Sequence, residues 1–351
     1  MTLEPADLRA AVGAGIVTEA QAARLAALAA DRRNGRDGAR PGEEPFELFR
    51  GFNEIFIVVG LGILASGWFG VLALAAGLGD WSAVWTLGLS ATLLLIALLA
   101  EYFIRRRRMV APAILLTVGW TIVTFGLLSL LFRSVTLLGG VDPEGSILPL
   151  LLTALAVGAF WLRYRVPFAM AAMAAAAFGA LILTLAAATG EDVTTESLLL
   201  LSGEGPFALG TLAFGLVLFG FAMRFDMADP HRVSLRSASG FWLHVVAAPA
   251  IVNTVALSLL EGGTGARALL AVFLAAIALV AVVIDRRSFL ISAAGYTVAL
   301  VAVATEGDAF APVILAIGAA LVALGAGWQA ARARLVAPLP GRLRDRLPPA
   351  A

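Results

Sequence analysis

The sequence contains no cysteine and no lysine, and these two absences exclude several kinds of chemistry. Without cysteine, the chain can form no disulfide, thiolate metal site or thiol nucleophile. All 25 basic residues are arginine, so there is no Schiff-base amine and no P-loop lysine to hold a nucleotide phosphate. An ATP-driven pump within this chain is therefore not expected.

Histidine and charged residues are also scarce. His231 and His244 are too few for a three-histidine zinc site or for bis-histidine pairs on two haems, so we expect no metal and no cofactor. Charged residues make up 14% of the chain, whereas a soluble domain carries about a quarter. Hydrophobic residues make up 60%, and the mean hydropathy is +0.93. This apolar excess predicts a lipid bilayer as the main partner, with no role for nucleic acid.

The apolar residues are grouped into runs of about 17 to 25 residues, the length that crosses a bilayer as a helix. The sequence therefore predicts an all-α, polytopic transmembrane bundle of ten spans, which make up a domain over residues 55–330. The predicted spans are residues 55–77, 82–104, 109–132, 147–163, 167–188, 207–224, 240–260, 267–284, 288–305 and 311–330.

The loops between these spans alternate in charge. Thirteen arginines follow the even-numbered spans, in stretches such as "RRRR" and "DRR", and only two follow the odd-numbered spans. By the positive-inside rule, both termini lie in the cytoplasm. An error of one helix would place successive arginine clusters on opposite sides, so the pattern also supports an even number of spans.

Three further segments flank the spans. Residues 1–33 read as a cytoplasmic helical hairpin, in which Thr18 and Gln21 fit a capping box and Ile16, Leu25 and Leu28 form a thin apolar stripe. Residues 34–54 read as a polar linker and an interfacial segment, and residues 331–351 as a cytoplasmic tail.

Four polar residues at membrane depth are candidates for function, because such groups are costly in lipid: His244, Glu54, Glu101 and Asn253. The two carboxylates also have a structural interpretation. Glu54 follows Arg50 by four residues and Glu101 precedes Arg105 by four, a spacing that allows an ion pair on one helix face. The three ionisable groups fall near the cytoplasmic ends of their helices, where they could meet at one level.

His244 has no ion-pair partner at helical spacing within its own helix. It is either a satisfied interfacial or inter-helix histidine or a group that lines a cytoplasm-facing cavity and titrates near neutral pH. Pro249 keeps the second interpretation open, since it frees the carbonyl of Val245 and kinks the helix. Asn253 is nine residues from His244 and points to the opposite face, so the two do not form one site.

Arg105 to Arg108 offer a further choice. Such a run can bind an anionic lipid or a phosphate, but a juxtamembrane arginine run more often acts as a topology determinant.

Several stretches together carry a resemblance to a known class: "GIVTEAQAARLAAL", "GFNEIFIVVGLG", "RYRVPF" and "FWLHVVAAP". In this layout, the chain resembles uncharacterised bacterial multi-span membrane proteins of the domain-of-unknown-function class, which have a short N-terminal cytoplasmic helical segment. The arginine-only, alanine-rich composition indicates a high-GC bacterium, and hence a location in the inner membrane. The resemblance carries over no site residues.

Three functions stay open at this point. The first is a non-catalytic interaction or envelope-associated role, because the chain has no HExxH pair, no GxSxG elbow and no GxGxxG after a strand. The second is a secondary transporter of small metabolites, similar to drug and metabolite transporters with two inverted five-span halves. The third is a membrane enzyme on lipid-linked substrates, with His244 or Glu101 as base; one histidine without an acid or metal partner is a poor catalytic set.

Overall fold

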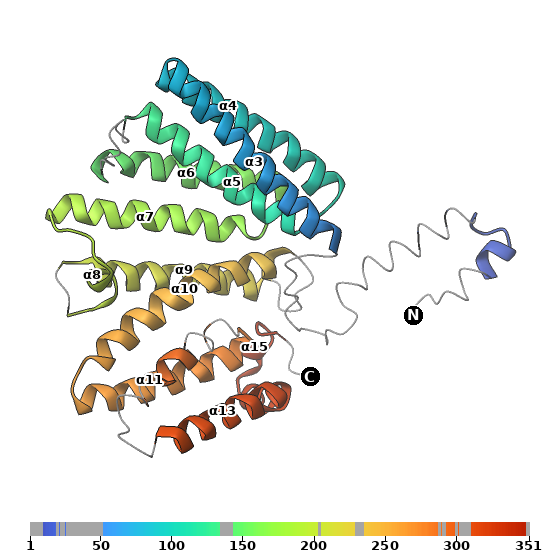
Figure 1. Ribbon diagram of the computed structural model, residues 1–351. Helices are drawn as coiled ribbons and strands as arrows, with labels where there is room; N and C mark the ends of the chain where they lie inside the picture. Colours follow the sequence, from blue (N-terminus) through green and yellow to red (C-terminus); the bar gives the residue numbers. More distant parts are fainter. Residues whose placement is uncertain are drawn as a thin grey trace.

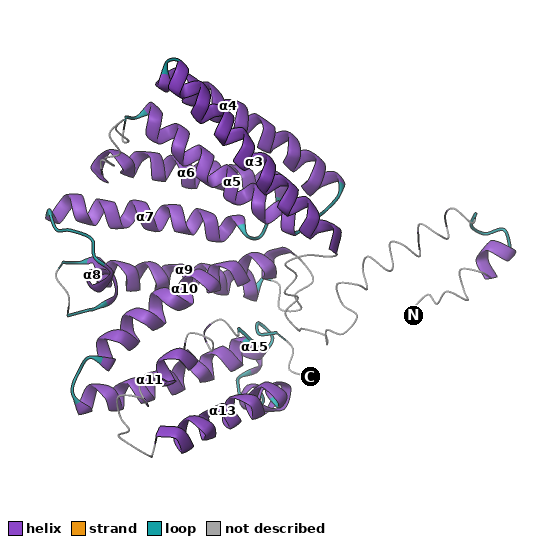
Figure 2. Ribbon diagram, viewed as in Figure 1, coloured by secondary structure: helices purple, strands orange, loops and turns teal. Residues whose placement is uncertain are grey.

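The computed structural model of the chain describes residues 10–18, 21, 25, 52–133, 143–202, 205–228, 235–286, 289, 293–298, 301 and 310–348. Within these ranges, every regular element is a helix and none is a strand (Figure 2). The prediction of an all-α helical bundle is confirmed.

The helices lie side by side across the molecule, from α3 and α4 at one edge to α13 at the other (Figure 1). Their bounds are α3 (Phe52–Leu78), α4 (Trp81–Ala100), the π-helix η1 (Glu101–Arg106), α5 (Ala111–Leu131), α6 (Pro143–Tyr164), α7 (Ala169–Thr189), α8 (Thr195–Leu199), α9 (Phe207–Met227), α10 (Leu235–Leu260), α11 (Thr264–Ile284), α13 (Phe310–Ala326), α14 (Trp328–Val336) and α15 (Gly341–Arg344).

Eight of these helices are long and apolar enough to cross a membrane: α3, α4 continued by η1, α5, α6, α7, α9, α10 and α11. They coincide with the first eight predicted spans, so the chain has the character of a multi-pass membrane protein. The ninth predicted span, 288–305, falls largely outside the described residues. The tenth, 311–330, is broken, because the chain bends by 76° between α13 and α14; counting that pair as one span gives nine.

Close helix packing in the bundle depends on glycine. A methyl group on Gly215 of α9 would lie 2.9 Å from the Cβ of Ala250 in α10, closer than real Cβ atoms approach. At Gly179 of α7, the methyl group would lie 3.3 Å from Cδ1 of Leu150 in α6, a tight contact with a flexible side chain. Since lipid gives no hydrophobic drive for helix association, such close backbone approach is the main source of helix packing.

Several buried hydroxyl side chains inside the helices are satisfied locally. Thr117, Thr153 and Thr254 are buried, and each donates a hydrogen bond of 2.7 to 2.8 Å to the carbonyl oxygen four residues earlier. These bonds remove the cost of an unpaired hydroxyl at membrane depth.

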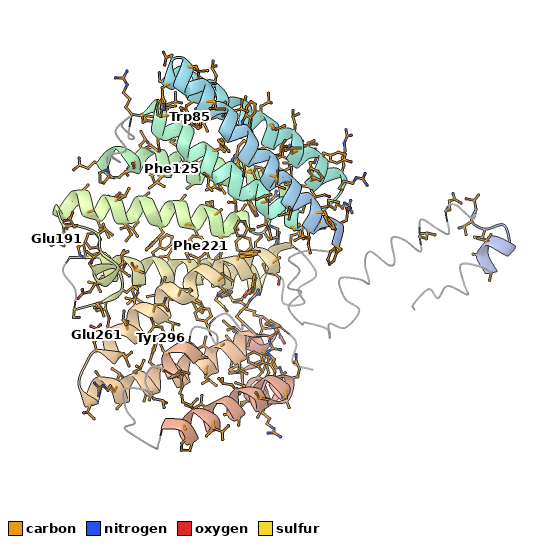
Figure 3. All side chains as sticks on the ribbon, in the orientation of Figure 1. Trp85, Phe125, Glu191, Phe221, Glu261 and Tyr296 are labelled. Carbon is orange, nitrogen blue, oxygen red and sulfur yellow. The ribbon has the colours of Figure 1, made fainter. Side chains whose placement is uncertain are left out.

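The two ends of the bundle differ. Glu191, which follows α7, and Glu261, which follows α10, lie at one end (Figure 3). The end of α9, the start of α10 and the end of α11 meet at the other end (Figure 1).

The last residues that the structure describes pack against that second end. Trp328 and Arg332 of α14 are buried, and Leu347 belongs to the same hydrophobic core as α10 and α11. Residues 328–348 therefore form part of the folded bundle, although 331–351 read as a tail in the sequence. At the other terminus, α3 begins at Phe52, inside the segment that the sequence assigned to the linker.

Candidate functional site

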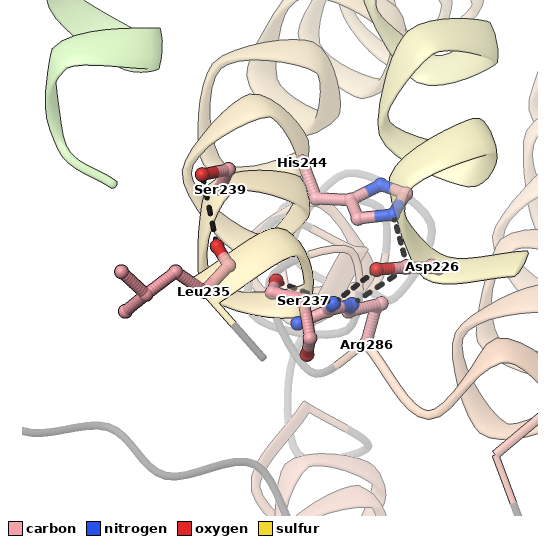
Figure 4. Close-up of polar contacts among 6 residues, drawn as sticks. All are labelled: Asp226, Leu235, Ser237, Ser239, His244 and Arg286. Carbon is pink, nitrogen blue, oxygen red and sulfur yellow. Dashed lines mark hydrogen bonds and ion pairs between the residues drawn. The ribbon is translucent and has the colours of Figure 1, made fainter. Parts of the chain in front are cut away.

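A buried ionic cluster joins three helices at the second end of the bundle (Figure 4). It consists of Asp226 from α9, His244 from α10 and Arg286, which follows α11. The Nε of Arg286 donates to Oδ2 of Asp226 at 2.9 Å, and its Nη2 donates to Oδ1. The Nε2 of His244 lies 2.9 Å from the same Oδ2. The three side chains are 5%, 0% and 1% exposed, in chain order.

Gly240 allows α10 to approach the aspartate. A methyl group on Gly240 would lie 2.6 Å from Oδ1 of Asp226 and 3.3 Å from the carbonyl oxygen of Ala222. His244 lies one helical turn further along α10, on the same face as Gly240. The small residue thus brings the two helices together at the level where the histidine meets the carboxylate.

The end of α11 orients the arginine. Asp285 adopts a left-handed conformation, with φ of 57°, and the backbone nitrogen of Arg286 donates to the carbonyl oxygen of Ala281 at 2.9 Å. This is the hydrogen-bond pattern of a Schellman motif, which reverses the chain after a helix. Nη2 of Arg286 also donates to the backbone oxygen of Ser237 at 3.0 Å, which attaches the start of α10.

Asp285 extends the junction to α14. Its Oδ1 accepts a hydrogen bond of 2.6 Å from Nε1 of Trp328. Further along α14, Arg332 donates to the backbone oxygen of Pro348. Two consecutive residues at the end of α11 therefore connect it to α9, α10 and α14.

Apolar rings surround the histidine. The ring centroids of Phe219 and Phe289 lie 5.5 and 5.7 Å from that of His244, both in edge-on geometry. A charged pair is stable in such a low-dielectric environment only when its geometry is good and further hydrogen bonds satisfy its other donors and acceptors. The fork of Arg286 on Asp226, completed by His244, meets that requirement.

The chemistry open to this cluster is limited, because both oxygens of Asp226 accept from protein donors. Within the part of the chain that the structure describes, no group of three or more histidine, aspartate or glutamate residues could hold a metal ion. The cluster therefore has the character of a structural junction.

Glu54 has a different role, at the start of another helix. Its side chain is 5% exposed, and its Oε2 accepts from the backbone nitrogens of Val110 at 3.2 Å and Ala111 at 2.9 Å. These donors belong to the first turn of α5, where helix amides have no partner within the helix. Glu54 thus caps α5 from α3. The predicted partner Arg50 lies outside the described residues.

Glu101 forms the predicted ion pair with Arg105, four residues later, and a second pair with Arg163 of α6, whose Nη2 lies 3.1 Å from Oε2. Its side chain is 38% exposed. Glu54, Glu101 and His244 bind three different sets of partners, so they do not form one site.

The remaining candidates lie outside the ionic cluster. Asn253 is half-buried in α10, nine residues after the fully buried His244. Pro249 lies within α10, which continues through it from Leu235 to Leu260, and the proline is exposed on the outer face of the helix. The proline therefore gives no support to a cavity beside His244.

Sequence reasoning missed Asp226 and Arg286, the two partners of the histidine. Both stand in arginine-containing stretches that read as cytoplasmic loops, "RFDM" and "DRR". Asp226 in fact lies in the last turn of α9, which runs three residues beyond the predicted span. The available signal was a lone carboxylate beside the end of an apolar run. In comparisons with known proteins, no family model, curated protein or solved structure matches the chain.

Proposed function

We propose that the chain is a non-catalytic integral membrane protein with an interaction or envelope-associated role, and that its N-terminal residues 1–33 bind a protein partner. The observation that carries this proposal is the closed state of the buried ionic cluster. The strongest candidate for chemistry has both carboxylate oxygens of Asp226 occupied by Arg286 and His244. A carboxylate whose two oxygens are both bound by protein side chains suits a structural role.

The N-terminal segment supports the choice of surface. Thr18 and Gln21 form both bonds of a capping box, at 2.9 and 3.3 Å, and Gln21 is helical. Ile16 is 75% exposed and Leu25 is 45% exposed. These are the described members of the apolar stripe, and exposed apolar residues on both sides of a helix cap suit contact with a partner.

We place the protein in a bacterial inner membrane with both termini in the cytoplasm. This topology rests on the alternation of arginine between loops. Glu191 and Glu261 lie at the end of the bundle opposite the buried ionic cluster, and this separation supports the proposed topology (Figure 3). The arginine-only, alanine-rich composition supports a bacterial origin.

The test compares complexes of the full chain extracted in mild detergent. Replacing Ile16 and Leu25 together by serine is expected to reduce the mass of the complex to that of the protein in its micelle. Gln21→Glu is the matched control, because glutamate preserves the capping box on the same exposed helix. An unchanged complex in the double variant, or in a chain that lacks residues 1–45, would remove the support for this surface.

The second candidate is proton-linked transport of small metabolites. It is favoured by one observation: His244 and Asp226 form a buried pair of titratable groups at membrane depth. Transport would require water to reach this pair during the cycle, and the reactivity of a thiol placed beside the cluster distinguishes the two functions.

A further inference from the structure

Six arginines from two separate segments, the end of η1 and the end of α6 with the residues that follow each, share one exposed surface. We call Arg105, Arg106, Arg107, Arg108, Arg163 and Arg165 the arginine patch; all six are exposed. Glu101 joins the two segments, since its two oxygens pair with Arg105 and Arg163. The only carboxylates that contact this region among the described residues are Glu101 and the buried Glu54, so the patch is strongly positive.

Aromatic side chains hold part of the patch at a defined depth. Nε and Nη2 of Arg107 donate to the hydroxyl of Tyr102 at 3.2 and 3.1 Å. The guanidinium of Arg165 lies 4.8 Å from the ring centroid of Trp161, within the range of a cation-π contact. Tyrosine and tryptophan favour the interface between lipid and water, so these contacts place the guanidinium groups at the level of lipid headgroups.

A left-handed residue ends the helix in each of the two segments. Arg108 has a φ of 53° and Arg165 a φ of 56°, the conformation that Asp285 adopts after α11. The chain therefore turns directly after η1 and α6, and the arginines beside both helix ends stay exposed.

Exposed apolar side chains continue the surface toward the membrane interior. Leu162, next to Arg163, is 60% exposed, and Leu98, about two turns before Arg105, is 62% exposed. A ligand that meets both parts must carry an anionic head and apolar chains. We propose that the arginine patch binds the phosphate headgroup of an anionic phospholipid, with the acyl chains along α4 and α6.

The test titrates the full chain in phosphatidylcholine nanodiscs with phosphatidylglycerol and measures bound lipid by native mass spectrometry. The variant is Arg106→Gln with Arg108→Gln, because within the described residues these two side chains make none of the ion pairs or ring contacts of the other four. The matched control is Arg342→Gln with Arg344→Gln, two exposed arginines of α15.

Removal of two headgroup contacts is expected to weaken phosphatidylglycerol binding about 10- to 30-fold, while the control changes it less than about 3-fold. Added salt is expected to weaken binding to the wild-type chain. Equal binding of phosphatidylglycerol and phosphatidylcholine would overturn the proposal, and so would an equal loss in the control. Full competition by inorganic phosphate would also overturn it, in favour of a soluble anion site.

Discussion

Separating the charges of Asp226 and Arg286 is expected to destabilise the bundle strongly. The side chains are 5% and 1% exposed and share a two-pronged contact, so neither charge can be solvated in place. Removing one partner of such a pair costs about 3 to 5 kcal/mol, because the other charge is left buried and uncompensated. We expect a loss of that size for Arg286→Met and for Asp226→Leu.

The double variant, with both changes, distinguishes a coupled pair from two independent residues. An apolar pair of similar volume often replaces a buried ion pair at little cost, so the double variant is expected to lose less than about 3 kcal/mol, far below the sum of the single losses. The loss of the His244 contact accounts for part of the remainder. The assay is reversible unfolding in mixed micelles with increasing dodecyl sulfate, followed by tryptophan fluorescence.

The matched control is the exposed pair of Glu101 and Arg163, whose side chains are 38% and 51% exposed. The same cycle there is expected to give a coupling below about 1 kcal/mol. Additive losses at Asp226 and Arg286, or single losses no larger than those of the control pair, would refute the description of the cluster as a buried, coupled junction.

Three further predictions follow from other contacts. Gly240→Ala is expected to lower the free energy of unfolding by about 1 to 3 kcal/mol, because the added methyl group meets Asp226. The control is Gly220→Ala in α9, where nothing lies within 4 Å of the added methyl group; it is expected to be neutral or stabilising. Equal effects of the two changes in the unfolding assay would contradict the close approach of α10 to Asp226. Glu54→Ala is expected to cost about 1.5 to 3 kcal/mol and Glu54→Gln less, since glutamine still accepts a hydrogen bond from α5. Both variants unfolding like the wild-type chain would show that the cap contributes nothing. The backbone nitrogen of Ala83 holds the pKa of the Asp80 carboxyl below its usual value. The stabilisation by the ionised Asp80 carboxylate is therefore complete above about pH 3.9 and is lost as the pH falls through the lowered pKa. The difference in melting temperature between the wild-type chain and Asp80→Asn should shrink over that pH range. A difference that grows there would contradict the predicted direction of the pH dependence.

Much of the fold could be predicted because length and apolarity are local properties. Eight predicted spans coincide with eight helices, and the capping box at Thr18 was readable from two residues. The break before Trp328 was not predicted, although Gly325 and Gly327 stand at it and Gly327 is the N-cap of α14. Glycine inside an apolar run is common, and the hydrogen bond from Trp328 to Asp285 at the start of α14 is a tertiary contact.

The site was only half predictable. His244 could be selected as a rare polar residue in an apolar run, but its partners come from elements 18 residues before and 42 residues after it. Arginine at a helix end gives the same sequence signal whether it faces headgroups or a buried carboxylate. Arg105 and Arg286 illustrate this, since the first is exposed and the second fully buried. The packing of the end of α11 against α9 and α10 distinguishes them, because it places Arg286 beside Asp226 and Ser237.

The most direct test of the closed junction is the access of water to the cluster. The chain has no cysteine, so a single thiol can be introduced cleanly. Ser237 is 4% exposed beside Arg286, and Ser237→Cys is nearly isosteric; Ala337→Cys, at an exposed position, is the reference. In nanodiscs, a charged, water-soluble thiol reagent is expected to modify the cysteine at 337 rapidly and the one at 237 only after unfolding in dodecyl sulfate. Modification at 237 in the folded protein, at a rate near that at 337, would contradict the closed junction and favour the transport function.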